Sequence, residues 1–104
     1  MELSRVDLLK HLLEQDPTSL LARYGLAMEC MNNGDPAAAD THFRALLAST
    51  PEYIPTYLMY GQLLVRESRS SEAKQVLSNG IAAAAKKGDQ HASSEMEALL
   101  NELS

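Results

Sequence analysis

Few side chains in this chain of 104 residues belong to the types that most often carry out chemistry. The three histidines, His11, His42 and His91, fall on three different predicted helices, and none has a second histidine or cysteine at metal-ligand spacing. The single cysteine, Cys30, could act as a nucleophile. The chain has no glycine-rich phosphate loop, no nucleophile elbow and no paired zinc-binding histidines. We therefore predict that it is not an enzyme and has no catalytic residues, metal site or cofactor.

The charge balance and hydropathy of the chain exclude several other classes of protein. Nine Lys and Arg against fourteen Asp and Glu give a net charge of −5, which disfavours a nucleic-acid partner. No apolar run approaches the roughly 20 residues that cross a bilayer, so no membrane partner is predicted. Charged residues also interrupt any signal peptide at Glu2, Arg5, Asp7 and Lys10. These features predict a soluble, cytoplasmic protein.

Turn signals and apolar spacing predict an all-α chain. The leucines at positions 8, 9, 12 and 13 share one helical face, whereas the alternation typical of strands is absent. Asp16-Pro17 is expected to end one helix and cap the next, and Asn33-Gly34-Asp35-Pro36 is the clearest turn. Lys86-Lys87-Gly88-Asp89 has the cationic last turn, glycine cap and aspartate start expected between two helices. The six predicted helices are 3–15, 18–33, 36–49, 54–67, 70–86 and 89–103.

The helices recur with a period of 34 residues. Large apolar residues align with one another in this register, as do small residues and prolines. The aligned sets include Leu9, Phe43 and Leu77; Leu13, Leu47 and Ile81; Ala27 and Gly61; Ala39 and Ala73; and Pro17 and Pro51. Small residues allow paired helices to approach closely, so we expect crossings of Ala27 on Ala39 and of Gly61 on Ala73. We expect Gly80 to be a close-packing site inside a continuous helix, although a break at Asn79-Gly80 is the alternative.

A 34-residue helix–turn–helix period with this signature resembles the tetratricopeptide repeat (TPR) family. In the first full repeat the positions of the family pattern are occupied by Arg23, Leu26, Ala27, Cys30, Ala39, Phe43 and Pro51. The second matches it at Tyr57, Tyr60, Gly61, Leu64, Ala73 and Leu77. Three positions depart from the pattern: Arg23 replaces a Trp, Cys30 replaces an aromatic and Ala85 replaces the closing Pro. Because Cys30 takes the place of a core aromatic, the resemblance favours a buried, inert thiol.

The resemblance implies a single domain over 1–104, an array of antiparallel helix hairpins forming an α-α superhelix. It would consist of an N-terminal half-repeat helix (1–16), repeat 1 (17–51), repeat 2 (52–87) and a C-terminal capping helix (88–104). The last helix carries polar residues beside Met96, Leu99 and Leu100, as suits a cap. The N-terminal helix has a broad apolar sector, which either covers the first repeat or awaits a partner.

In this family the first helix of each repeat lines a concave groove that holds a peptide or a partner helix. The corresponding positions here share a helical face and are largely apolar. They are Leu21, Tyr24, Met28 and Met31 in the first repeat, Leu58, Gln62, Val65 and Arg66 in the second, and Ala92, Met96 and Leu99 in the last helix. Only Arg66 is cationic, which disfavours the carboxylate clamp by which some family members hold chaperone tails. Plain packing of these residues against each other is the alternative.

These features predict a small protein–protein interaction module that binds a peptide or amphipathic helix in an apolar groove. The alternative is a self-assembling homodimeric scaffold, in which a second copy fills the groove or covers the N-terminal helix. No residue favours a third possibility, regulation of a neighbouring enzyme or secretion apparatus.

Overall fold

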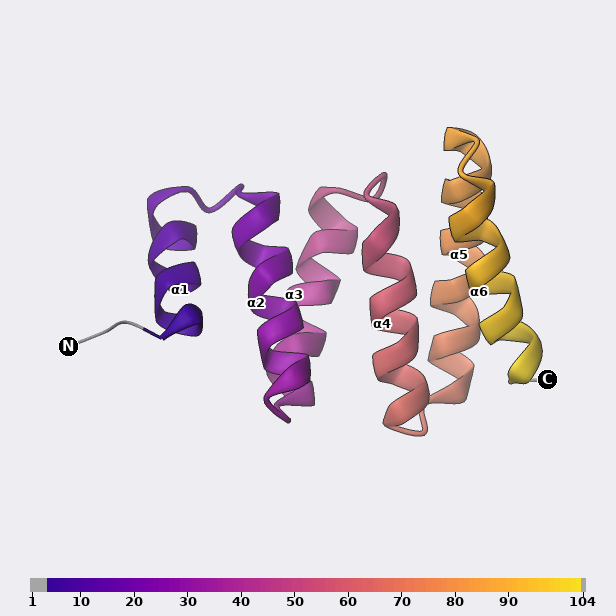
Figure 1. The fold of residues 1–104 in the computed structure, drawn as a ribbon, viewed down its shortest axis with the longest axis horizontal. Helices are drawn as coiled ribbons and strands as arrows, with labels where there is room; N and C mark the ends of the chain where they lie inside the picture. The colour runs from indigo at the N-terminus through magenta and orange to yellow at the C-terminus, as the bar shows by residue number, and fades with distance from the viewer. Residues whose placement is uncertain (1–3, 104) are drawn as a thin grey trace. The chain divides into compact units, whose positions relative to one another are not determined.

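The computed structural model describes residues 4–103 and is helical throughout, with no strand in that range. This confirms the predicted all-α class and its six helices. The helices are α1 (Arg5–Gln15), α2 (Leu20–Asn32), α3 (Pro36–Ser49), α4 (Ile54–Arg66), α5 (Ser70–Lys87) and α6 (Gln90–Glu102), as labelled in Figure 1. None of these helices combines the length and hydropathy needed to cross a membrane.

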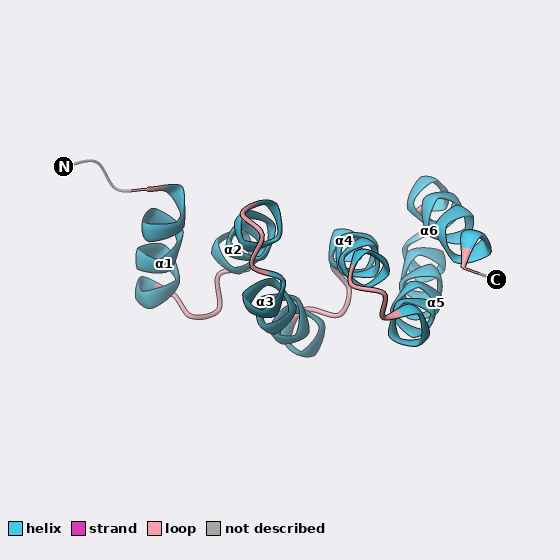
Figure 2. Ribbon diagram, turned by 90° about the horizontal axis from the view of Figure 1, so that it is seen from below, coloured by secondary structure: helices cyan, strands magenta, loops and turns pink. Residues whose placement is uncertain are grey.

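The helices form two compact units, Met1–Thr50 and Pro51–Ser104. In the first unit α2 packs along α3, and α1 packs against α2. In the second unit α5 packs between α4 and α6, which also touch each other. Short loops connect successive helices in both units (Figure 2), as expected for antiparallel hairpins. Each unit therefore contains one complete hairpin and one additional helix.

Side-chain caps begin four of the helices. Ser4 Oγ accepts the Asp7 N–H at 3.1 Å, and Ser19, Asp35 and Asp89 accept equivalent bonds at the starts of α2, α3 and α6. Asp16 was expected to cap α2, and this prediction is wrong. Its carboxylate instead accepts the Thr18 N–H at 3.0 Å and the Thr18 hydroxyl at 2.6 Å, which closes the α1–α2 turn and leaves capping to Ser19. These two hydrogen bonds also lower the pKa of Asp16.

Left-handed backbone conformations mark the turns between paired helices. Gly34 closes the α2–α3 turn with φ of +78°, and Gly88 closes α5 with φ of +72°. Ser68 lies 34 residues after Gly34 and adopts φ of +59° in the α4–α5 turn. The two repeats therefore use the same turn geometry, but the second achieves it with a residue that has a Cβ atom.

Replacing Ser68 by glycine is expected to stabilise the protein by about 0.5–1 kcal/mol, because glycine adopts positive φ without steric cost. Urea unfolding monitored by circular dichroism measures the change. The matched control is S78G at an exposed position inside α5, where glycine is expected to destabilise by about 0.5 kcal/mol. If S68G and S78G lowered the free energy of unfolding to the same extent, the positive φ of Ser68 would not be a source of strain.

The cores follow the predicted periodicity. Phe43, Leu46 and Leu77 are fully buried, whereas Leu47 and Ile81 are half-buried. Ala27, Ala39 and Ala73 are also completely buried, as small crossing residues should be. At Gly61 the prediction was incomplete. A Cβ there would lie 2.6 Å from Leu77 Cδ2, so its nearest side chain is Leu77 rather than Ala73, one turn earlier on α5.

Gly80 lies inside the unbroken helix α5, which confirms the expected continuous helix and excludes the break at Asn79-Gly80. It is buried, and a Cβ added to it would lie 2.5 Å from both Met96 Sδ and Tyr57 Cβ. The close-packing role predicted for Gly80 is thus confirmed. At Gly80 the side chains of Tyr57 on α4 and Met96 on α6 both approach the backbone of α5 closely.

Candidate functional site: apolar helix faces

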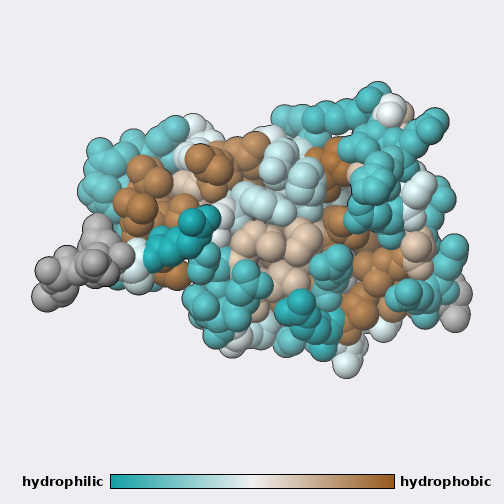
Figure 3. Space-filling view, viewed as in Figure 1, coloured by the Kyte–Doolittle hydropathy of each residue, from teal (hydrophilic) through white to brown (hydrophobic). Residues whose placement is uncertain are grey.

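The first unit exposes an apolar surface on α1 and α2. Among residues 4–103, the large hydrophobic side chains exposed to solvent are Leu8 (47%), Leu12 (43%) and Leu21 (78%), all of them in this unit. Leu8 and Leu12 lie one turn apart on α1 and so share a face. Figure 3 shows apolar side chains gathered over α1 and the adjoining end of α2. We call Leu8, Leu12 and Leu21 the unit 1 apolar surface.

The predicted groove residues of α2 differ in accessibility. Leu21 is almost fully exposed, Tyr24 and Met28 are half-buried, and Met31 is only 5% exposed. The predicted face of α2 is thus exposed at the start of the helix and buried near its end. Leu21 is accessible to solvent, Tyr24 and Met28 are partly accessible, and Met31 is buried.

The second unit presents the corresponding face on α4. Leu58, Gln62 and Val65 are half-buried and Arg66 is exposed at the last turn of the helix. Leu58, Gln62 and Val65 recur every three or four positions, and Arg66 follows Gln62 by four, so they form one continuous face with three apolar or amide side chains and one cation.

The α6 part of the predicted groove is mostly internal. Met96 is completely buried, and its sulfur lies beside Gly80 and close to Tyr57. It therefore joins α6 to the core of the second unit and is not available to a partner in this conformation. Ala92 and Leu99 are half-buried on the same helix.

Leu8 and Leu12 were not among the predicted groove residues. The sequence shows an apolar sector too broad for a simple amphipathic helix, which is the signal that could have identified them. Only the packing of α1 separates the leucines that face α2 from those that do not. Leu9 is 7% exposed, and its methyl groups lie closest to a Cβ placed at Gly25. Leu8 and Leu12, on either side of Leu9 in sequence, are left at the surface.

Titratable side chains in the described part of the chain do not assemble into a metal-binding cluster of His, Cys, Asp or Glu. His91 is exposed and forms an ion pair with Glu95, at 2.5 Å, whenever its imidazole is protonated. His42 differs from His91, because it is half-buried and its Nδ1 lies 3.4 Å from Arg23 Nη1. Arginine can only donate, so His42 Nδ1 is the acceptor in a hydrogen bond with Arg23. Arg23, which replaces the usual Trp of the repeat, thus adds to the effect of burial in favouring the neutral imidazole.

Acidification is expected to destabilise the protein through His42. Burial lowers the pKa of His42, and the Arg23 and Lys10 cations lower it further. The unfolded chain therefore takes up a proton near pH 6.5 while the folded chain does not, so the free energy of unfolding falls as pH drops below about 6.5. Urea titrations between pH 7.5 and 5 should show a smaller loss for H42Q than for the natural protein. The exposed-histidine control H11Q should keep the full loss, and an unchanged slope in H42Q would contradict this assignment.

Cys30 is half-buried on α2. Burial raises the pKa of its thiol, and the Asp35 carboxylate raises it further. The thiolate, which is the nucleophilic form, is therefore scarce at neutral pH. This environment agrees with an unreactive thiol.

Similar chains are known in several bacteria, although no family model matches this one. A TPR repeat-containing protein of Pseudomonas aeruginosa is 27% identical over 95 residues, covering 91% of this chain and 90% of that protein. The solution structure of a tetratricopeptide repeat domain protein from Salinibacter ruber is 30% identical, covers 85% of this chain and 89% of its own, and superposes with a TM-score of 0.79.

A protein from Bordetella parapertussis extends the similarity over nearly the whole chain. Its solution structure is 27% identical, covers 98% of this chain and 89% of its own, and gives a TM-score of 0.85. The shared helices, the 34-residue period and the identity to the Salinibacter ruber domain agree with the repeat signature at Ala27, Ala39, Gly61 and Ala73. The chain belongs to the tetratricopeptide repeat family.

Proposed function

We propose that this protein is a non-catalytic interaction module, which binds a peptide or amphipathic helix of a partner protein through the apolar faces of α2 and α4. Membership of the repeat family supports the general role, because such arrays present extended binding surfaces. A cytoplasmic location is part of the same proposal. Leu8 and Leu12 of the unit 1 apolar surface would add contacts on α1 to those of the groove positions on α2.

The observation that carries the proposal is the exposure of Leu21. A leucine that keeps 78% of its surface in water adds little to the core, and it belongs to the same unit as the exposed Leu8 and Leu12. Clustered exposed apolar side chains mark interaction sites more often than scattered ones do. Half-buried Met28 adds a flexible side chain that adapts to different partners.

The charge variant L21E tests the proposal. We expect it to reduce partner binding at least tenfold, because a carboxylate would be buried against apolar groups. Its circular dichroism spectrum and urea midpoint should remain unchanged, since Leu21 is exposed. The control A48E adds the same charge at an exposed position on α3 and should bind normally. Binding by L21E as tight as that of A48E would contradict the role of α2.

The α4 face is tested in the same way with L58E. Leu58 is half-buried, so its unfolding midpoint must be measured alongside binding. Loss of binding with an intact midpoint would support the α4 face. Loss of the fold would instead assign Leu58 to the core of the second unit.

A second candidate function is a homodimeric scaffold. The exposed pair Leu8 and Leu12 on α1 favours it, because a second copy would cover this face. Sedimentation equilibrium over about a hundredfold range of concentration separates the two functions. A constant monomer mass supports the adaptor, whereas a reversible shift to dimer that is lost in L12E supports the scaffold.

A further inference from the structure

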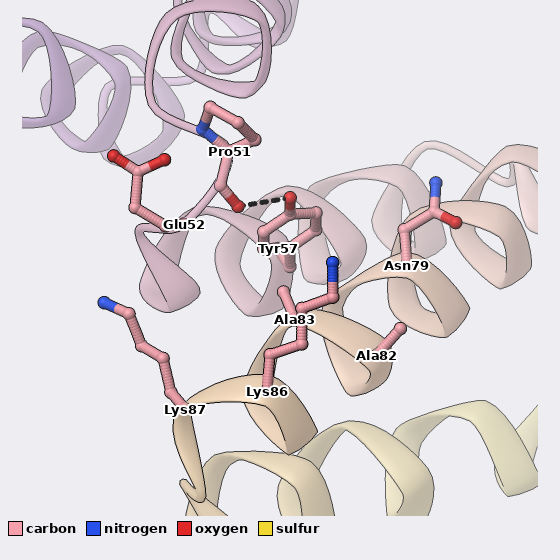
Figure 4. A pocket seen from close by; sticks show the side chains of 8 residues that line it. All are labelled: Pro51, Glu52, Tyr57, Asn79, Ala82, Ala83, Lys86 and Lys87. Atoms are coloured by element: carbon pink, nitrogen blue, oxygen red, sulfur yellow. Dashed lines mark hydrogen bonds between the residues drawn. The ribbon is translucent and has the colours of Figure 1, made fainter.

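We propose that a surface cavity of the second unit, at the C-terminal end of α5, binds an acidic peptide segment. The cavity has a volume of about 320 Å³ and lies between the last turns of α5 and the loop that leads into α4 (Figure 4). This size is in the range of small-ligand sites, roughly 300–1,000 Å³. None of its lining residues belongs to the predicted groove faces, so the inference is independent of the function proposed above.

Two lysines supply the positive charge of the cavity. In Figure 4 the Lys86 side chain extends across the cavity toward Tyr57, whereas Lys87 lies nearer the side of Glu52. Within residues 4–103 neither lysine forms an ion pair or a hydrogen bond. Lysines at a helix C-terminus already complement the helix dipole, so their sequence position alone does not indicate a ligand. Their location on the wall of a cavity does.

The rest of the lining is fixed by bonds inside the unit. Tyr57 is 8% exposed and donates its hydroxyl hydrogen to the Pro51 carbonyl oxygen at 2.5 Å, which holds the loop against α4. Burial, with a further contribution from the Glu52 carboxylate, raises the pKa of Tyr57, so the phenol remains a donor at neutral pH. Asn79 Oδ1 accepts from Gln75, which leaves the Asn79 amide hydrogens for a ligand.

The 34-residue repeat gives the first unit a cavity of the same construction. That cavity, of about 300 Å³, is lined at equivalent positions by Pro17, Arg23 and Ala45 where the second unit has Pro51, Tyr57 and Asn79. The cavity itself is therefore a product of repeat packing. The charges of the second cavity are not repeated in the first. The cation that lines the first cavity is Arg23, which already contacts His42. Only the second cavity combines two unpaired lysines with a free amide.

The lining of the second cavity, which combines cationic, apolar and acidic side chains, suits a peptide better than a free phosphate ion. Lys86 and Lys87 would attract a carboxylate, while Ala82 and Ala83 offer an apolar wall that an inorganic anion would not use. The Glu52 carboxylate would repel any anion close to it, a phosphate dianion or a peptide carboxylate alike, but it can accept a backbone N–H of a peptide. An acidic segment with small apolar side chains suits the lining when its carboxylates lie at Lys86 and Lys87 and its backbone lies at Glu52.

The test is a titration of the isotope-labelled full chain, followed by amide NMR, with a ten-residue peptide of alternating glutamate and alanine. We expect saturable shifts at Asn79, Ala83 and Lys86 and none at Val65 or Leu21. The double variant K86A/K87A should weaken binding about tenfold, as expected for the loss of two partly exposed ion pairs. The control K10A/K74A removes the same charge at exposed positions outside the cavity and should bind within twofold of the natural protein.

Three results would overturn the inference. If K10A/K74A weakened binding as much as K86A/K87A does, the overall charge of the protein would explain the effect. If the matching glutamine–alanine peptide bound equally well, carboxylates would not be required. Inorganic phosphate that produces the same shifts at the same concentration would make the cavity a small-anion site. Because neither Leu21 nor Leu58 lines this cavity, its failure would not affect the groove proposal, nor the reverse.

Discussion

Replacing Phe43 by alanine is expected to lower the free energy of unfolding by about 3–5 kcal/mol. Phe43 is the only phenylalanine of the chain, it is completely buried, and it occupies the aromatic position of the repeat signature on α3. Truncation removes the largest fully buried side chain and leaves a cavity that rigid neighbouring helices cannot close.

Urea unfolding followed by circular dichroism measures this loss, and L47A on the same helix is the control. Leu47 is half-buried, so its truncation should cost clearly less than that of Phe43. A loss in F43A that is no greater than the loss in L47A would show that Phe43 does not form the core of the first unit.

Replacing Gly80 by alanine is expected to destabilise the protein by about 1–3 kcal/mol, although alanine is the better helix former. The new methyl group would lie 2.5 Å from Tyr57 Cβ, an atom next to the backbone that cannot rotate away. It would also lie 2.5 Å from Met96 Sδ, which belongs to a flexible side chain. The helices must therefore move apart at this crossing.

The matched control is G25A, which makes the same substitution inside α2. A Cβ there would meet the Leu9 methyl carbons at 3.0 and 3.2 Å, and a small rotation of Leu9 relieves this contact. The gain in helix propensity should then offset most of the strain, giving a change near zero. A G80A variant as stable as G25A in urea would contradict the close contact of α5 with α4 and α6.

The fold could be predicted because its determinants are local and repeated. Gly34, Gly88, Asp35 and Asp89 specify turns and caps through their own backbone and side-chain chemistry. The prediction for Asp16 was wrong because its carboxylate can accept hydrogen bonds in two ways. It can cap the next helix or close its own turn. The choice depends on Thr18, whose amide and hydroxyl both reach it.

The accessibility of the candidate site could not be predicted to the same extent. Spacing identifies residues that share a helical face, but it does not say how much of the face a neighbouring helix covers. Met96 has groove spacing on α6, yet the absence of a side chain at Gly80 allows it to enter the core. Leu8 and Leu12 have core spacing on α1, yet α1 meets α2 through Leu9 and leaves them exposed.

The most direct test of the proposed function is selection from a library of random sixteen-residue peptides displayed on phage, with the natural protein as bait. We expect enriched peptides with apolar residues three or four positions apart, which bind the natural protein and A48E but lose at least tenfold in affinity for L21E. Enriched peptides that bind L21E as tightly as the natural protein would contradict the proposed function, because the exposed apolar face of α2 would then not be the binding surface.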